Sequence, residues 1–99
     1  MLHIVNKSPY ERNSLESCLR LATKGSAVLL IEDGVYGATK GGNFEGKVQA
    51  AMADVKIYAL GPDLSARGMA DRVLEGVSVV DYGGFVDLVA EHSNCQSWL

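Results

Sequence analysis

The chain has 99 residues, of which 47% are hydrophobic, and its formal net charge is −3 at pH 7. This length predicts one domain, residues 1–99, with no room for a second core. Basic residues neither predominate nor cluster, which argues against direct nucleic-acid binding. Asn6 and Lys7 end the apolar start, so we expect neither a signal peptide nor a membrane segment. Cys18 and Cys95 show no disulfide-framework spacing, which indicates a reduced, cytoplasmic protein.

Four hydrophobic runs of strand length recur along the chain, at residues 2–5, 27–32, 55–60 and 77–80. The second run is rich in branched aliphatic residues without a polar break, which is typical of an interior strand buried on both faces. Lys56 in the third run indicates either an edge strand or a strand end near solvent. The apolar end of the tail, 93–99, is compatible with a short fifth strand.

The first helical segment follows two cap-like patterns, Ser8-Pro9-x-Glu11 and Asn13-x-x-Glu16. We favour a tight turn at Ser8 and a helix that begins near Asn13. Its apolar positions recur at i, i+3, i+4 and i+7, the pattern of one face packed on a sheet; they are Leu15, Cys18, Leu19 and Ala22. Gly25 is expected to close the helix as its C-cap.

The later segments alternate with the strands. A glycine-rich irregular stretch, a helix, a helical turn and a last helix are expected at 35–43, 44–53, 63–68 and 85–92 respectively. The last helix should carry Phe85, Leu88 and Val89 on one face.

Alternation of strands and helices predicts right-handed crossovers. The fold class is therefore a small three-layer α/β domain with a mainly parallel sheet of four to five strands. Only three helices serve two faces, so we expect another subunit to complete one face or one edge. The isolated chain should self-associate or be unstable, because stable interfaces remove roughly 1,200 Å² or more.

The carboxyl end of the second strand is where such folds usually place their sites, and it carries Glu32, Asp33 and Gly34. Asp-Gly is also a common turn pair, and we favour the interpretation that it only turns the chain. His3 is interpreted as a strand histidine, because no second ligand lies at metal spacing. We therefore predict no metal site and no cofactor.

A near match to the phosphate-binding P-loop runs from Gly41 through Gly46-Lys47-Val48. Val48 stands where a Ser or Thr would hold magnesium, and no strand runs directly into Gly41. No G-x-G-x-x-G follows a strand, and G-x-S-x-G is absent. We therefore reject a P-loop, and the chain has no support for a dinucleotide site.

Cys18 is the candidate catalytic thiol. A sulfur carrier needs an accessible thiolate, favoured by a helix N-terminus or by nearby positive charge. Cys18 lies beyond the first helical turn and on the apolar face, so we favour a buried cysteine with a normal or raised pKa. Cys95 has better access, but only His92 lies near enough in sequence to lower its pKa, so we favour an inert thiol there too.

Several stretches share their order and spacing with one known family. They are Leu2-His3 with Ser8-Pro9, Glu32-Asp33-Gly34-Val35, Tyr58-Ala59-Leu60-x-x-Asp63-Leu64-x-Ala66-Arg67-Gly68, Asp81-Tyr82-x-x-Phe85-Val86 and Gln96-x-Trp98. In these stretches the chain resembles the DsrH/TusB sulfur-relay family over essentially its whole length. The segment from Asn6 to Leu19 resembles the DsrH branch of sulfur-oxidising bacteria more than the TusB branch.

The resemblance implies a DsrE/DsrF/DsrH-like fold and a place in a cytoplasmic heterohexamer of three proteins in two copies each. Its partners would be DsrE/TusD-like and DsrF/TusC-like subunits and, through the complex, sulfur carriers of the TusA and DsrC/TusE type. The family assigns the sulfur-carrying cysteine chiefly to the DsrE/TusD-like partner, and Cys18 matches a cysteine of the DsrH branch. The relayed persulfide would serve either dissimilatory sulfur oxidation or 2-thiolation of tRNA wobble uridine.

We therefore predict an accessory subunit of a sulfurtransferase complex, with persulfide moving mainly on its partner. Two alternatives stay open. In the first, Cys18 itself carries persulfide; in the second, the chain is a stand-alone homo-oligomeric binding module without sulfur chemistry. Accessibility of the Cys18 thiol distinguishes the accessory subunit from the persulfide carrier. Co-purification with a DsrE-like partner distinguishes both of these from the stand-alone module.

Overall fold

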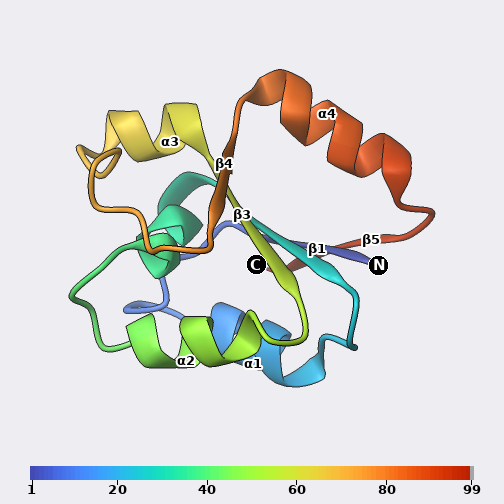
Figure 1. Ribbon diagram of the computed structural model, residues 1–99, viewed down its shortest axis with the longest axis horizontal. Helices are drawn as coiled ribbons and strands as arrows, with labels where there is room; N and C mark the ends of the chain where they lie inside the picture. The colour runs from blue at the N-terminus through green and yellow to red at the C-terminus, as the bar shows by residue number, and fades with distance from the viewer. Residues whose placement is uncertain (99) are drawn as a thin grey trace.

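The computed structural model describes residues 1–98 (Figure 1). The strands are β1 (Leu2–Val5), β2 (Ala27–Leu30), β3 (Lys56–Leu60), β4 (Ser78–Val80) and β5 (Cys95–Trp98). The helices are α1 (Ser14–Leu21), the 3-10 helix η1 (Glu32–Ala38), α2 (Glu45–Ala51), α3 (Gly61–Ala66) and α4 (Tyr82–Glu91). None of the described helices combines the length and the apolar character that crossing a membrane requires.

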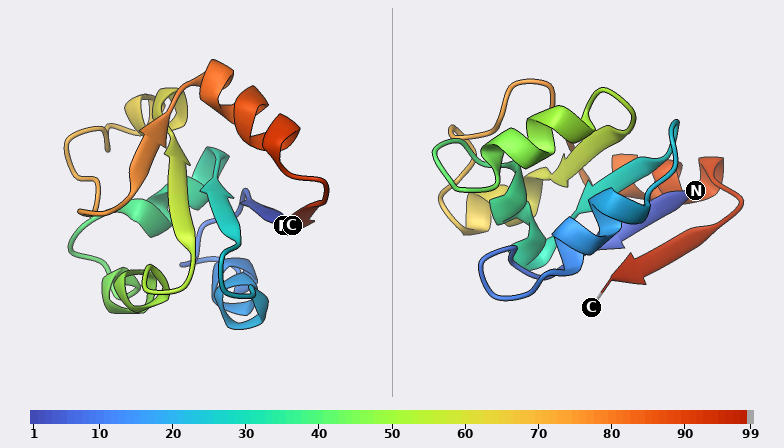
Figure 2. Two further views of the ribbon diagram at one scale, coloured as in Figure 1. Left: turned by 45° about the vertical axis from the view of Figure 1, so that its right-hand side comes forward. Right: turned by 90° about the horizontal axis from the view of Figure 1, so that it is seen from below.

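The five strands form one sheet in the order β4-β3-β2-β1-β5, and every neighbouring pair is parallel. The parallel sheet and the interior place of β2 are thereby confirmed. The tail does form a fifth strand, which lies beside β1 with Cys95 opposite Leu2 (Figure 2). Leu99, the last residue of the expected tail strand, lies outside the described residues.

One face of the sheet, which we call the closed face, is covered by α1, α2 and η1, and Leu64 of α3 also packs into it. Figure 1 shows α1 and α2 together below the sheet. Side chains alternate along each strand, so every second residue points to this face. The buried residues of its cluster are Val5, Leu15, Cys18, Val28, Leu30, Val35, Ala38, Val48, Val55, Ile57, Ala59, Leu64 and Leu74. This cluster is the larger part of the core.

The opposite face, which we call the α4 face, carries a smaller cluster. Its buried residues are Leu2, Ala27, Leu29 and Leu88, and Phe85 packs against them from the same helix as Leu88. Figure 1 shows α4 above the strands β1 and β2, on the side away from α1 and α2. The shortage of helices that the sequence predicts therefore falls on this face.

The C-terminal end of α1 differs from the sequence prediction. The helix ends at Leu21, and its C-cap is Ala22 in an extended conformation, so the assignment of Gly25 as C-cap is wrong. Gly25 instead has φ of +90° in the turn before β2, where its N–H donates to the carbonyl of Asp54. Glycine is used there because the left-handed region is costly for other residues.

The segment after β2 also differs, because residues 32–38 form η1 where an irregular stretch was expected from residue 35. Its first turn is closed by the Gly34 N–H, which donates to the Ile31 carbonyl at 2.8 Å. Such i to i+3 bonds build short 3-10 segments that no 3.6-residue apolar period announces.

The last two helices begin earlier than expected. Pro62 lies in the first turn of α3, where its missing N–H costs nothing. The Asp81 carboxylate accepts the Gly84 N–H at 2.8 Å and so caps α4 at Tyr82. Val89 does not share the buried face of α4, since 40% of it is exposed.

Lys56 is exposed at the amino end of β3, which lies inside the sheet. The strand-end interpretation is therefore right, and the edge interpretation is wrong.

Candidate functional site

The carboxyl ends of the paired strands β2 and β3 lie side by side, and η1 and α3 begin there. The backbone N–H of Glu32 donates to Asp63 Oδ2 at 2.6 Å. Arg67 Nε donates to Asp33 Oδ1 at 2.9 Å, and its guanidinium lies 4.0 Å from Asp63 Oδ1. The segment that leaves β2 is therefore tied to α3 by charge-assisted hydrogen bonds.

Glu32 occupies an unusual backbone conformation at this junction, with φ of +50°. A residue with a side chain pays about 1–2 kcal/mol for this left-handed conformation. The bond to Asp63 satisfies the N–H that the sharp turn leaves outside the sheet. Asp63 therefore supports the turn that Asp33 and Gly34 were expected to make.

Gly34 is required by close packing. A Cβ atom at this position would collide with the carbonyl oxygen of Val5. That carbonyl already accepts the N–H of Ile31 at 3.0 Å, so it cannot move away freely. The structure thus favours the interpretation that Asp33 and Gly34 only turn the chain. The Asp33 carboxylate is paired with Arg67, and the Gly34 backbone packs against β1.

In the segment that nearly matches a P-loop, from Gly41 to Val48, polar groups are paired within the chain. The Gly41 N–H donates to Glu45 Oε1 at 2.8 Å, and Lys47 Nζ donates to Glu16 Oε1 at 2.8 Å. Lys47 also lies 5.4 Å from the centroid of the Phe44 ring. The glycine N–H and the lysine that would hold phosphate are therefore engaged elsewhere.

Cys18 is completely buried in the closed face, as the helical pattern predicted. Burial raises the pKa of its thiol to about 12, from an ordinary value of 9.0. The neighbouring Leu15 is also fully buried. A thiol in this setting stays protonated near neutral pH, and the thiolate is the nucleophilic form.

Cys95 occupies the other extreme. It is exposed at the start of β5, on the edge of the sheet. The ring of His92 is turned to its own helix, with Nδ1 2.8 Å from the Leu88 carbonyl oxygen. Within residues 1–98, no group of three or more metal-binding side chains is close enough to hold a metal ion.

Two features of the structure were not predicted from the sequence. Trp98 Nε1 donates to His3 Nδ1 at 3.1 Å, which joins the two ends of the chain. His3 is only 5% exposed, and burial lowers its pKa, with a smaller contribution from the charged amino terminus. The second feature is the exposed apolar side of α4, which the run Phe85-Val86-x-Leu88-Val89 could have indicated because it is too apolar for one buried face.

Solved structures share this architecture. The ychN protein from E. coli superposes with a TM-score of 0.81 at 18% identity, over 98% of this chain and 97% of that chain. A protein of unknown function from Methanobacterium thermoautotrophicum gives 0.75 at 26% identity, over 97% and 95%. The chain is therefore a small parallel α/β protein of the ychN fold.

Sequence comparison goes further than the fold. A model of the family described as "DsrH like protein" matches residues 7–95. Proteins named TusB from Pectobacterium parmentieri and Shigella flexneri are 38% and 36% identical over 98 residues, which is 99% of this chain and 100% of each relative. The chain belongs to the DsrH/TusB family, and this membership implies a subunit of a sulfur-relay complex. The leaning toward the DsrH branch stays a prediction.

Proposed function

We propose that this chain is an accessory subunit of a heterohexameric sulfurtransferase complex that relays persulfide sulfur between protein cysteines. DsrE/TusD-like and DsrF/TusC-like subunits would complete the complex, which would exchange sulfur with carriers of the TusA and DsrC/TusE type. Family membership over the whole chain supports this proposal. The chain acts in the cytoplasm as one domain, residues 1–99.

The chemistry of the relay explains why the role is accessory. An acceptor thiolate attacks the outer sulfur of a persulfide, the S–S bond breaks, and the donor cysteine leaves as a thiolate. The single observation that carries the accessory role is the burial of Cys18, which raises its pKa to about 12. Such a thiol can neither ionise readily nor be reached by a second protein. This supports the proposal that persulfide moves mainly on the DsrE/TusD-like partner.

Two pathways fit this role. The relatives named TusB support 2-thiolation of tRNA wobble uridine. The stretch from Asn6 to Leu19 supports dissimilatory sulfur oxidation instead. Gene neighbourhood distinguishes them, because siroheme sulfite reductase genes beside this gene would mark the oxidation branch.

The test uses this chain co-expressed with the DsrE/TusD-like and DsrF/TusC-like subunits of the same organism. A tag on this chain should recover both partners, and the complex should accept persulfide sulfur from a loaded carrier. Cys18→Ser in the complex should leave that loading unchanged. Recovery of this chain alone, as a homo-oligomer, would favour the stand-alone binding module.

Alkylation separates the accessory role from the carrier role. Iodoacetamide is applied to the native Cys95→Ser variant, in which Cys18 is the remaining thiol. We expect slow modification near neutral pH and fast modification after unfolding in urea. Fast modification of the native protein, together with loss of sulfur loading in Cys18→Ser, would make this chain a persulfide carrier.

A further inference from the structure

Exposed apolar side chains gather on one part of the molecule. Among residues 1–98, four of the large hydrophobic side chains that remain exposed come from β4 and α4. Three of them lie on α4, Tyr82 (61% exposed), Val86 (65%) and Val89 (40%), and we call these three the α4 surface. Val79 (53%) lies on the neighbouring edge strand β4, opposite Ala59, and therefore points to the other side of the sheet. An exposed apolar cluster of this kind usually marks a site of protein contact.

The α4 surface follows the period of a helix. Tyr82, Val86 and Val89 recur at i, i+4 and i+7, so they form a stripe along one side of α4. Phe85 and Leu88 pack instead on the sheet. A helix that is apolar on two sides is typical of one that is covered on both, and the chain itself covers only the inner side of α4.

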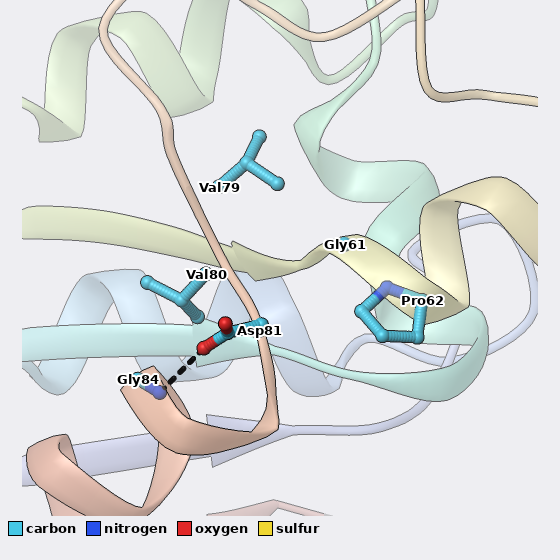
Figure 3. Close-up of a pocket in the computed structure, with 6 residues that line it drawn as sticks. All are labelled: Gly61, Pro62, Val79, Val80, Asp81 and Gly84. Atoms are coloured by element: carbon cyan, nitrogen blue, oxygen red, sulfur yellow. Dashed lines mark hydrogen bonds between the residues drawn. The ribbon is translucent and has the colours of Figure 1, made fainter.

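An open hollow of about 460 Å³ continues the surface beyond the amino end of α4. It is lined by Gly61, Pro62, Val79, Val80, Asp81 and Gly84 (Figure 3). One oxygen of the Asp81 carboxylate accepts the Gly84 N–H at 2.8 Å, and the side chain remains exposed. The hollow therefore offers a partner an apolar wall from Pro62, Val79 and Val80 with a negative charge beside it.

Charge around the surface narrows the choice of occupant. Residues 73–99 contain no Lys or Arg, and their acidic residues are Glu75, Asp81, Asp87 and Glu91, all exposed. A second copy docked through the same surface in a two-fold arrangement would bring these like charges together. Juxtaposed like charges suppress a wrong partner, whereas a basic rim would be attracted.

We infer that the α4 surface binds a different subunit, one that presents an apolar patch bordered by Lys or Arg, and not a second copy of this chain. This inference rests on the proposed function, which supplies DsrE/TusD-like and DsrF/TusC-like subunits as candidates. It adds which face of this chain makes the contact and which charge the partner carries there.

The first test substitutes Val86→Glu, with Leu21→Glu as the matched control. Both residues are helical and almost equally exposed, at 65% and 64%. Leu21, however, lies on α1, which covers the closed face on the opposite side of the sheet. The probes are the purified DsrE/TusD-like and DsrF/TusC-like subunits of the same organism, with affinity measured by calorimetry. Val86→Glu should weaken binding by at least about tenfold, because it places a charge in an apolar contact. Leu21→Glu should leave the affinity within about twofold.

The second test reverses charge with Asp87→Lys and Glu91→Lys together, and Glu11→Lys in the exposed loop after β1 is the control. Wild-type association should slow as salt is added, and the double variant should associate several-fold more slowly than wild type at low salt. The control should associate at the wild-type rate. If the double variant associates at the wild-type rate, the inference that Lys or Arg border the partner's apolar patch is wrong.

The outcomes separate the two proposals. Wild-type chain that binds neither subunit overturns the proposed function and this inference with it. A second outcome is that the wild-type chain binds a subunit, but Val86→Glu binds it equally well or Leu21→Glu loses as much affinity. This outcome would contradict the α4 surface as the contact site and leave the proposed function intact. Self-association of the wild-type chain in sedimentation that Val86→Glu abolishes would make a second copy the occupant and overturn the inference. Circular dichroism and the urea midpoint of each variant establish that it is folded.

Discussion

The closed face and the α4 face are built by alternate residues of the same strands, yet they are covered differently. Within residues 1–98, thirteen buried residues form the cluster of the closed face, whereas four form that of the α4 face. On the closed face α1, α2 and η1 bury the apolar side chains, whereas on the other face α4 leaves Tyr82 and Val86 in solvent. Apolar content therefore has two uses in this chain, to stabilise the fold on one side and to offer a contact surface on the other.

The largest expected effect contrasts Leu30→Ala with Val86→Ala. Leu30 is fully buried at the centre of the closed face, so its truncation should lower the free energy of unfolding by about 2–5 kcal/mol. Val86 is 65% exposed, so its truncation should change that free energy by no more than about 0.5 kcal/mol. Urea denaturation followed by circular dichroism measures both. Equal losses would mean that α4 is as tightly packed as the closed face.

Gly34→Ala probes how tightly η1 is packed at the end of the closed face. The added methyl would meet the Val5 carbonyl oxygen, and we expect a loss of about 1–3 kcal/mol in the free energy of unfolding. Gly46→Ala is the control, because a Cβ there meets nothing within 4 Å and the residue lies inside α2. It should stabilise the protein by about 0.5–1 kcal/mol. A neutral Gly34→Ala would show that η1 can move away from β1.

Cys18→Ser and Cys95→Ser compare a buried with an exposed thiol. Cys18→Ser should cost about 1 kcal/mol, because it places a hydroxyl among apolar side chains. Cys95→Ser should cost no more than about 0.5 kcal/mol, because that residue is exposed at the sheet edge. Thermal or urea unfolding of the two single variants measures the difference. An equal cost would contradict the burial of Cys18.

The smallest expected effect concerns the β5 edge, where His3 accepts the Trp98 N–H. Burial lowers the pKa of His3 from 6.5, so the unfolded chain binds this proton at a higher pH than the folded chain does. Stability from this site is complete above pH 6.5 and is lost as the pH falls below 6.5 toward the lower pKa of the folded state. Protonated His3 can no longer accept the bond, so the fluorescence of Trp98, the single tryptophan, should change in the same range.

His3→Gln is the control for this pH dependence. Its amide oxygen can still accept a hydrogen bond, but the side chain does not titrate. The variant should lose the part of the pH dependence that His3 contributes to unfolding and to Trp98 fluorescence. Identical pH profiles for the variant and the wild type would contradict a role for this histidine.

Much of the fold follows from local patterns in the sequence. The apolar runs located β1, β2, β3 and β4, and their alternation with helical segments predicted a parallel sheet. The spacing of Leu15 and Cys18 in α1 was enough to predict that the thiol is buried. These features are readable because a strand or a helix records its buried face as a period of the chain itself.

Other features depend on which distant segments meet, and no local period records that. The contact of Gly34 with Val5, the pairing of Arg67 with Asp33 and the bond between His3 and Trp98 each join residues that are far apart in the chain. The sequence determined that α4 is rich in apolar residues, but its period could not say which of them the sheet would cover. Only the tertiary structure decided that Leu88 is buried and Val89 is exposed, because a helix packed on one side of a sheet can bury only one of its faces.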